Sequence, residues 1–403
     1  FNQICEFQIL KAKNNSFLGS ETCNLVIKQC TSFLAENKPK DNLFHTSFVS
    51  KISKCKFLSD SEKNNYINNS SVFPGYNKII SSLKDLQKSG YCKNNKGICH
   101  LKNGKSYYEF LVKNYTGSSK SVLELKSDIQ SRLMKDMRTM YSILTVNPEL
   151  ENMFYSEEHN SKSPQAILKE LNSKYTDDFP NIGNINYTVK YVDENLQDYL
   201  SPAFFLTPAI DDTNNNVIYI NESDAFSKQD IYTTLAHEGI PGHMYQSAFF
   251  LQTNPLPVRH ILSYGGYTEG WATYVEFLSY SYEYSDQRLA KALSCSASYS
   301  LALYSLCDIG INYEGWSFKE TKDFLKNYNI TGDDICKNIY QTVINEPANY
   351  LQYYVGYLEI TALKEKVQKQ LGTDFTLKDF HKSFLTIGPA DFKTVEKWIY
   401  TFY

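Results

Sequence analysis

The sequence predicts a mainly α-helical protein with one small antiparallel β-sheet beside a helix that carries a His-Glu pair. Over most of the chain, apolar residues recur at steps of three and four, which places them on one face of a helix. Residues 185–221 differ, because they contain short alternating runs rich in β-branched and aromatic residues, a pattern typical of strands. We therefore expect a small sheet in the middle of a helical chain.

Within the first part of the chain, residues 1–90, weak helical patches occur over residues 18–90 and are interrupted by Pro39 and Pro74. We expect it to be a helical region of the same fold as residues 91–403. The clearest helix spans residues 121–144 and ends near Pro148. Its apolar face consists of Val122, Leu125, Ile129, Leu133, Met137, Met140 and Leu144.

Three short runs predict the strands: residues 187–192, 204–206 and 217–220. Prolines and a polar turn cluster at residues 211–216 bound them, and such residues commonly end strands. Residues 320–371 and 376–400 again predict helices. Gly372 is expected to end the first of these, and Gly388-Pro389 to form a turn.

Composition excludes several classes of function. The 403 residues include 41 Lys and Arg against 44 Asp and Glu, a net charge of −3, so no basic excess exists to bind nucleic acid. No apolar run approaches the ~20 residues that span a bilayer, so no transmembrane segment is expected. None of the nine cysteines forms Cys-x-x-Cys, which disfavours a thiolate zinc site. Either scattered buried thiols or, after export, one or two disulfides would explain them.

A candidate metal site lies in His237-Glu238-Gly-Ile-Pro241-Gly242-His243. On a regular helix the two histidines, six residues apart, would point ~120° apart and lie ~9 Å apart along the axis, so they could not bind one ion. Pro241 has no N–H for a helical hydrogen bond, and Gly242 adopts conformations that other residues avoid. We therefore expect the helix to break here and to bring His243 back toward His237. The alternative is a chance His-Glu pair beside an ordinary turn.

The third ligand is expected 26 residues beyond His243, at Glu269 in the stretch Gly265-Gly-Tyr-Thr-Glu269-Gly-Trp-Ala272. Catalytic zinc takes three protein ligands and leaves one position open. Glu276, seven residues later on the same helix face, is a candidate for orienting one of the histidines.

These motifs resemble those of the bacterial domain-of-unknown-function 885 family, which is grouped with zinc peptidases of the glutamate-zincin type. The family's His-Glu-x-x-Pro-Gly-His and Glu-Gly-Trp-Ala stretches match residues 237–243 and 269–272. Further matches are Ser201-Pro-Ala-Phe-Phe-Leu-Thr-Pro208, Asp308-Ile-Gly-Ile-Asn-Tyr-Glu-Gly-Trp316, Glu346-Pro-Ala-Asn-Tyr-Leu-Gln-Tyr353-Tyr-Val-Gly356 and Phe380-His-Lys-Ser-Phe-Leu-Thr-Ile-Gly388. The chain departs from the family at Asn312, where His is common, and at Ala348-Asn349, where Gly-Gln is common.

The resemblance implies a zincin-like catalytic domain over residues 91–403 and a role for each site residue. Glu238 would be the general base. Tyr353, counted forward from Pro347, would stabilise the oxyanion, with Tyr350 as the reserve. The remaining candidates are Phe204 and Phe205 on a substrate-binding edge strand, Arg259, His260 and Asn312 as substrate contacts, and Asp308 as a supporting residue or a helix cap.

The resulting hypothesis is a zinc-dependent metallopeptidase that acts on short peptides, with zinc as its cofactor. A non-catalytic surface lipoprotein with the same fold is the alternative, and a non-peptide hydrolase with the same metal site is a third candidate. The sequence begins at Phe1, so we expect a leader to have been removed and the protein to be exported. The pattern leaves the oligomeric state open.

Overall fold

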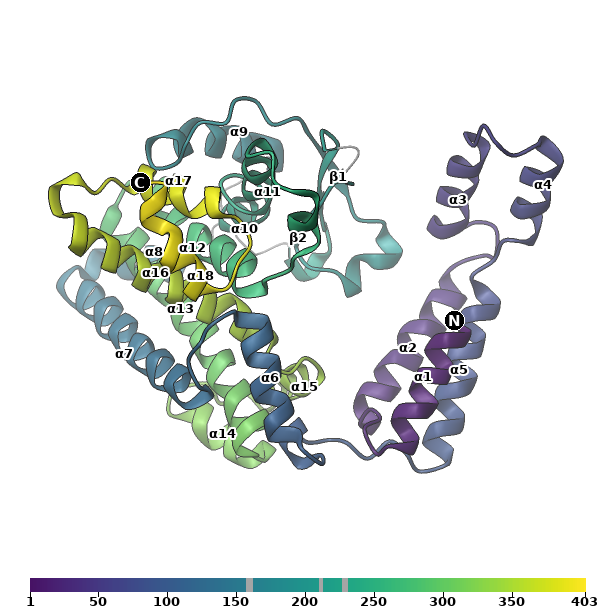
Figure 1. Cartoon of the computed structure of the whole chain (residues 1–403). Helices are drawn as coiled ribbons and strands as arrows, with labels where there is room; N and C mark the ends of the chain where they lie inside the picture. Colours follow the sequence, from purple (N-terminus) through teal and green to yellow (C-terminus); the bar gives the residue numbers. More distant parts are fainter. Residues whose placement is uncertain (157–161, 210–212, 227–230) are drawn as a thin grey trace. The chain divides into compact units, whose positions relative to one another are not determined.

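The computed structural model describes residues 1–156, 162–209, 213–226 and 231–403 (Figure 1). The chain divides into two compact units, Phe1–Lys102 and Asn103–Tyr403. All candidate site residues lie in the second unit. Residues 211 and 212 of the expected turn cluster lie outside the described part of the chain.

The first unit is helical. α2 packs against α5, α1 packs against α5, and α3 pairs with α4. A small apolar core of Ala12, Phe17, Cys23, Leu83 and Leu86 holds the unit together. Its helices are α1 (Asn2–Lys13), α2 (Ser20–Glu36), α3 (Leu43–Ser53), α4 (Asp60–Asn69) and α5 (Phe73–Lys88), followed by the 3₁₀ turn η1 (Ile98–His100).

The second unit is also mainly helical. The predicted helix over 121–144 is confirmed as α7 (Val122–Val146), and Ser121 and Glu124 form a capping box at its start. Before the sheet lie α6 (Gly104–Thr116), α8 (Glu151–Phe154) and α9 (Pro164–Lys174). After it come α10 (Ile231–Glu238), α11 (His243–Gln252), η6 (Pro257–Ile261), α12 (Gly265–Glu283), α13 (Gln287–Ile309) and the π-helical turn η7 (Gly310–Glu314).

The C-terminal helices agree with the predicted helical ranges. They are α14 (Phe318–Lys326), α15 (Asp333–Asn345), α16 (Asn349–Leu371), α17 (Leu377–Ile387) and α18 (Phe392–Trp398). Gly372 caps α16 and Gly388 caps α17, both at positive φ, a conformation that glycine adopts without steric cost.

The three predicted strands are confirmed as β1 (Tyr187–Tyr191), β2 (Ala203–Leu206) and β3 (Asn216–Ile220). The expectation of an antiparallel sheet is wrong. β3 is central and pairs antiparallel with β2 but parallel with β1, so the sheet is mixed. The alternation of side chains along a strand is the same whether the strand pairs parallel or antiparallel, so the pattern does not indicate the direction of pairing. The long connection between β1 and β3, which includes β2, allows β3 to return parallel to β1.

Three long helices, α12, α13 and α16, pack against one another and support the candidate site. α12 packs along α16 and also contacts α10 and α13. The backbones of α12 and α16 approach closely at Gly270 and Gly356, where a Cβ on Gly270 would lie 2.4 Å from the Cα of Gly356. α17 contributes Phe384, whose ring stacks on Tyr267 and Trp271 of α12. The elements that carry the candidate ligands therefore rest on a closely packed helical layer.

Each of the nine cysteines lies in the described part of the chain. Six are buried and three are partly buried. Among the described helices, none is both long enough and apolar enough to cross a membrane.

Candidate metal centre

A four-residue interruption separates α10 from α11. α10 ends at Glu238 and α11 begins at His243, so the predicted break is confirmed. Gly242 permits the tight turn, because a Cβ there would lie 1.8 Å from the carbonyl oxygen of His237. The imidazoles of His237 and His243 meet edge to face, with their ring centroids 4.8 Å apart. The break therefore brings two nitrogen ligands together that a continuous helix would hold ~9 Å apart.

Trp271 of the second motif holds this turn in place. Its indole Nε1–H donates to the carbonyl oxygen of Pro241 at 3.0 Å. The indole is fully buried and lies face to face with Phe384, with ring centroids 5.4 Å apart. Because a buried indole N–H needs an acceptor, this hydrogen bond ties the break between the histidines to α12.

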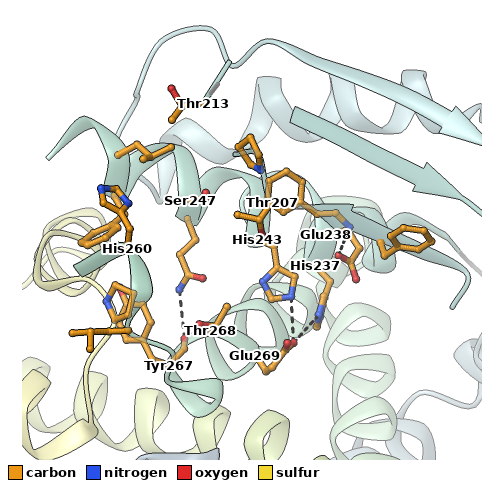
Figure 2. Close-up of a pocket in the computed structure, with 18 of the residues that line it drawn as sticks. Thr207, Thr213, His237, Glu238, His243, Ser247, His260, Tyr267, Thr268 and Glu269 are labelled. Carbon is orange, nitrogen blue, oxygen red and sulfur yellow. Dashed lines mark hydrogen bonds and ion pairs between the residues drawn. The ribbon is translucent and has the colours of Figure 1, made fainter. Parts of the chain in front are cut away.

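Glu269 of α12 completes a group of three ligands (Figure 2). Its Oε2 lies 3.2 Å from His243 Nε2 and 3.7 Å from His237 Nε2. The three ligand atoms all lie within 4.8 Å of one another. Burial alone would raise the pKa of Glu269, but His237 and His243 outweigh it and lower the pKa to about 2. The carboxylate is therefore ionised, as a metal ligand must be.

Glu276 orients His237 from the other side of the ring. Its Oε2 lies 2.8 Å from His237 Nδ1, and since a carboxylate accepts, Nδ1 carries the hydrogen. Burial lowers the pKa of His237, but Glu269 and Glu276 outweigh it and raise the pKa to about 10. Nε2 of His237 faces Glu269 and His243, and its lone pair can bind a metal ion once the proton on Nε2 has left. This orientation is typical of a carboxylate–histidine–metal arrangement.

These groups open onto a cavity of about 540 Å³, within the usual size range of small-ligand pockets. Glu238 and both aromatic residues of β2, Phe204 and Phe205, line it together with the three candidate ligands. Figure 2 shows Glu238 beside His237 on one side of the pocket and His260 with Tyr267 on the other.

Glu238 is coupled to the edge of the sheet. Its Oε2 accepts a hydrogen bond from the backbone N–H of Phe205 at 2.8 Å. β2 pairs only with β3, so its other edge is unpaired among the described strands. Asn221 N–H donates to the Pro202 carbonyl on the β3 side. Main-chain groups alternate along a strand, so those of Ala203 and Phe205 face away from β3. That edge offers main-chain hydrogen bonds next to Glu238.

Tyr353 of α16 also lines the cavity. Its ring lies 6.3 Å from that of His237, at an interplanar angle of 24°. Burial, followed by the charges of Glu269 and Glu238, raises the pKa of Tyr353 well above its usual value, so its hydroxyl stays protonated and can donate. Tyr350, the reserve choice, instead packs against Tyr304 with ring centroids 4.6 Å apart and does not line this cavity.

A family model described as "Bacterial protein of unknown function (DUF885)" matches residues 8–399. The chain belongs to the DUF885 family. The match begins within α1, so it extends into the first unit and beyond the motifs that suggested the resemblance. No curated protein matches this DUF885 chain.

Two solved structures share the fold of this DUF885 protein, and both proteins are described as a "putative lipoprotein". The one from Colwellia psychrerythraea is 22% identical, with a TM-score of 0.83 over 99% of this chain and 72% of that chain. The one from Shewanella oneidensis, of unknown function, is 18% identical, with a TM-score of 0.59 over 87% of this chain and 69% of that chain.

The structure separates the remaining candidates of this DUF885 chain. Arg259 and His260, both in η6, line the cavity. Asn312 and Asp308 do not line it and are fully buried elsewhere. The amide of Asn312 donates to Asp308 Oδ1 at 3.1 Å and to the Val343 carbonyl at 3.0 Å, so the structure places Asn312 in a buried hydrogen-bond network and not among the residues that line the cavity.

Several cavity residues escaped the sequence analysis of this DUF885 chain. Four of the missed residues lie on α11, three to eight positions after His243: Gln246, Ser247, Phe250 and Leu251. The 3.6-residue helical period counted from His243 would have identified them. Two others, Thr268 and Pro389, are the direct neighbours of Glu269 and Gly388.

Proposed function

We propose that this chain is a zinc-dependent metallopeptidase that hydrolyses peptide bonds of short peptides. The observation that carries the proposal is the convergence of His237, His243 and Glu269, whose ligand atoms lie within 4.8 Å of one another. They converge in a cavity that Glu238 and Tyr353 also line. Two imidazoles, a carboxylate and an adjacent acid are the groups that metal-assisted hydrolysis needs.

The donor set fits zinc. Catalytic zinc sites take three nitrogen, oxygen or sulfur ligands in a compact group, and this group offers two nitrogens and one oxygen. Glu276 adds the hydrogen bond to His237 Nδ1 that commonly orients a ligating histidine. Zinc bound there would polarise the substrate carbonyl and promote ionisation of the attacking water.

The chain's own side chains would move the protons and orient the substrate. Glu238 lies next to a ligand and in the cavity, where its carboxylate can take a proton from the attacking water and pass it to the leaving amine. The protonated hydroxyl of Tyr353 can donate to the carbonyl oxygen as negative charge develops there. The free edge of β2, which carries Phe205, suits an extended peptide, since strand addition uses such main-chain groups.

An extracytoplasmic location, as a cell-surface lipoprotein, belongs to the same proposal. It is supported by the two solved structures of the same fold, both of which carry lipoprotein descriptions. Fractionation of the producing cells, with immunodetection of the native protein, tests the location. Recovery in the cytoplasmic fraction alone would contradict it.

The decisive experiment combines metal analysis with a peptide-library digest. Purified protein is dialysed against zinc and then against buffer, and bound metal is measured by mass spectrometry. We expect about one zinc per chain, because one set of three ligands is present. His243→Ala and Glu269→Gln should lose most of the metal. His100→Ala, which removes an exposed histidine of the first unit, should keep it.

The digest distinguishes the competing functions. Cleavage of library peptides by the zinc-loaded wild type, absent from Glu238→Gln, supports the peptidase. A protein that binds peptides without cleaving any would instead be the non-catalytic lipoprotein. Zinc-dependent turnover of ester or amide substrates with no peptide cleaved would indicate a hydrolase of another class.

A further inference from the structure

Arg259 brings a positively charged group into the cavity that contains the candidate ligands. It lies in η6 (Pro257–Ile261), between the two metal-site motifs. Figure 2 shows its neighbour His260 with Tyr267 on the side of the pocket opposite His237 and Glu238. The charge of Arg259 also acts on the hydroxyl of Tyr267, which places the guanidinium on that side.

The guanidinium is held firmly by its surroundings. Its Nη2 donates to the carbonyl oxygens of Ile387 at 2.8 Å and Pro389 at 3.0 Å. These carbonyls lie at the end of α17 and in the turn that follows. The guanidinium lies over the ring of Phe250, with its central carbon 5.8 Å from the ring centroid. Such a fixed orientation lowers the entropy lost when a ligand binds.

The other donors of Arg259 remain uncommitted. A guanidinium has five N–H donors, and the two on Nη2 account for both hydrogen bonds. Within the described ranges, Nη1 makes no hydrogen bond, and the buried Nε has none either. The protein encloses Nε, so Nη1 is the group through which an oxygen ligand in the cavity would meet the guanidinium.

The charges along the cavity are unevenly distributed. Its described acidic residues are Glu238 and Glu269, and both are engaged away from Arg259. Glu269 contacts the two histidines, and Glu238 accepts from Phe205. No carboxylate of the described residues lies within ion-pair distance of Arg259. Ser247 and Thr268, which also line the cavity, are uncharged. Because no carboxylate offsets the charge of Arg259, this side of the cavity favours an anion.

We propose that Arg259 binds a carboxylate of the substrate, and that the preferred substrates are peptides that present their free C-terminus to it. The inference rests on the proposed function, since it places a peptide across a cavity with the candidate metal ligands on one side and Arg259 on the other. A planar guanidinium meets a carboxylate through directed hydrogen bonds, whereas lysine offers only a point charge. An acidic side chain near the C-terminus would supply the same chemical group.

Binding measurements test this independently of turnover. Three N-acetylated hexapeptides are used: a free acid, the same sequence as a C-terminal amide, and an amide with Glu as its last residue. Their affinities for zinc-loaded Glu238→Gln protein are measured by calorimetry. We expect the acid to bind ~10–100-fold more tightly than the plain amide, the usual effect of a charge-assisted hydrogen bond. Tight binding of the acid and of the Glu-containing amide would both support Arg259 as the carboxylate site, whereas tight binding of the Glu-containing amide alone would overturn the preference for a free C-terminus.

Variants identify Arg259 as the source of the preference. In the Glu238→Gln background, Arg259→Ala should abolish the ratio between acid and amide, and Arg259→Lys should keep part of it. Arg138→Ala, which removes an exposed arginine of α7, should leave the ratio unchanged. Thermal melting of each variant controls for loss of the two carbonyl contacts. The ratio is taken within one protein, so a partly unfolded sample does not alter it.

Three further results would overturn the inference. Equal affinities for the acid and both amides, or no measurable binding of any peptide, would show that Arg259 only ties η6 to the turn after α17. The same holds if Arg259→Ala lowers the melting temperature but preserves the preference for the acid. Failure of the proposed function looks different, because the wild type would then cleave none of the peptides while the binding preference could still be measured.

Discussion

The carboxylate of Glu238 accepts a hydrogen bond from the backbone N–H of Phe205 at 2.8 Å. This contact joins the residue next to a candidate ligand to the free edge of β2. The acid is therefore held in one orientation by the strand that would also receive an extended peptide. An amide side chain could accept the same hydrogen bond, so the contact makes a conservative substitution informative.

Glu238→Gln should lower kcat by ~10²–10⁴, the usual contribution of a general base, while zinc content stays at the wild-type level. The glutamine oxygen can still accept from Phe205, but it cannot take a proton from water. Kinetics with a cleaved library peptide and metal analysis are measured together. Glu222→Gln, at an exposed glutamate, is the matched control. Wild-type turnover in Glu238→Gln would remove Glu238 from the mechanism.

Glu276→Gln should weaken zinc binding by ~10–100-fold, as is typical when the partner of a ligating histidine is changed. The substitution replaces the carboxylate that lies 2.8 Å from His237 Nδ1 and leaves the three ligands in place. Competition with a fluorescent chelator measures the affinity. Unchanged affinity in the variant would mean that the packing around His237 orients the ring without Glu276.

Tyr353→Phe should lower kcat by ~10²–10³, the effect of removing one donor to a developing oxyanion. Zinc content and peptide affinity should stay close to wild type, because the ring is retained. Tyr350→Phe is the control, since its ring packs on Tyr304 and does not line the cavity. If both variants keep full kcat, the oxyanion is stabilised without either tyrosine.

Asp308 is expected to make stability depend on pH. Burial raises the pKa of Asp308 to about 7, although hydrogen bonds from Tyr108, Ala348 and Asn312 oppose the shift. Between ~4, the usual pKa of an unfolded Asp, and 7, the native state thus binds more protons than the unfolded state. Protonated Asp308 makes its full contribution to the free energy of unfolding below pH ~4, and this contribution is lost as pH rises through 7.

Asp308→Asn removes this titration, so the variant should gain stability relative to wild type as pH rises from 5 to 8. The expected gain is on the order of a few kcal/mol. Urea unfolding at both pH values measures it. Asp334→Asn, at an exposed aspartate of α15, should show no such pH-dependent difference. A constant difference between Asp308→Asn and wild type at both pH values would show that Asp308 does not titrate in this range.

Sequence patterns predicted the parts of this molecule that depend on local chemistry. The helix over 121–144 follows from its apolar spacing. The break between His237 and His243 follows from Pro241 and Gly242, because proline lacks an N–H and only a residue without Cβ fits against the His237 carbonyl. Pro241 and Gly242 bring His237 and His243 together, so the approach of these two candidate ligands could be anticipated from the sequence.

Features that depend on distant parts of the chain were not predictable in this way. Strand alternation does not encode direction, so the parallel pairing of β1 with β3 was missed. Asn312 was assigned to the substrate from a difference within a motif, which carries no information about packing. In the structure its amide donates to Asp308 Oδ1 and to the Val343 carbonyl, because η7 turns this part of the chain inward against α15.

The contact between Gly270 and Gly356 limits how this sequence can vary. A Cβ on Gly270 would lie 2.4 Å from the Cα of Gly356, and a Cβ on Gly356 would lie 2.6 Å from the Cα of Gly270. In most cores a larger side chain can be offset by a smaller one opposite. Here the residue opposite is already glycine, so no second-site suppressor can restore the space. Saturation mutagenesis should therefore find that neither position tolerates even alanine. Functional variants that accumulate many substitutions elsewhere should keep glycine at both positions.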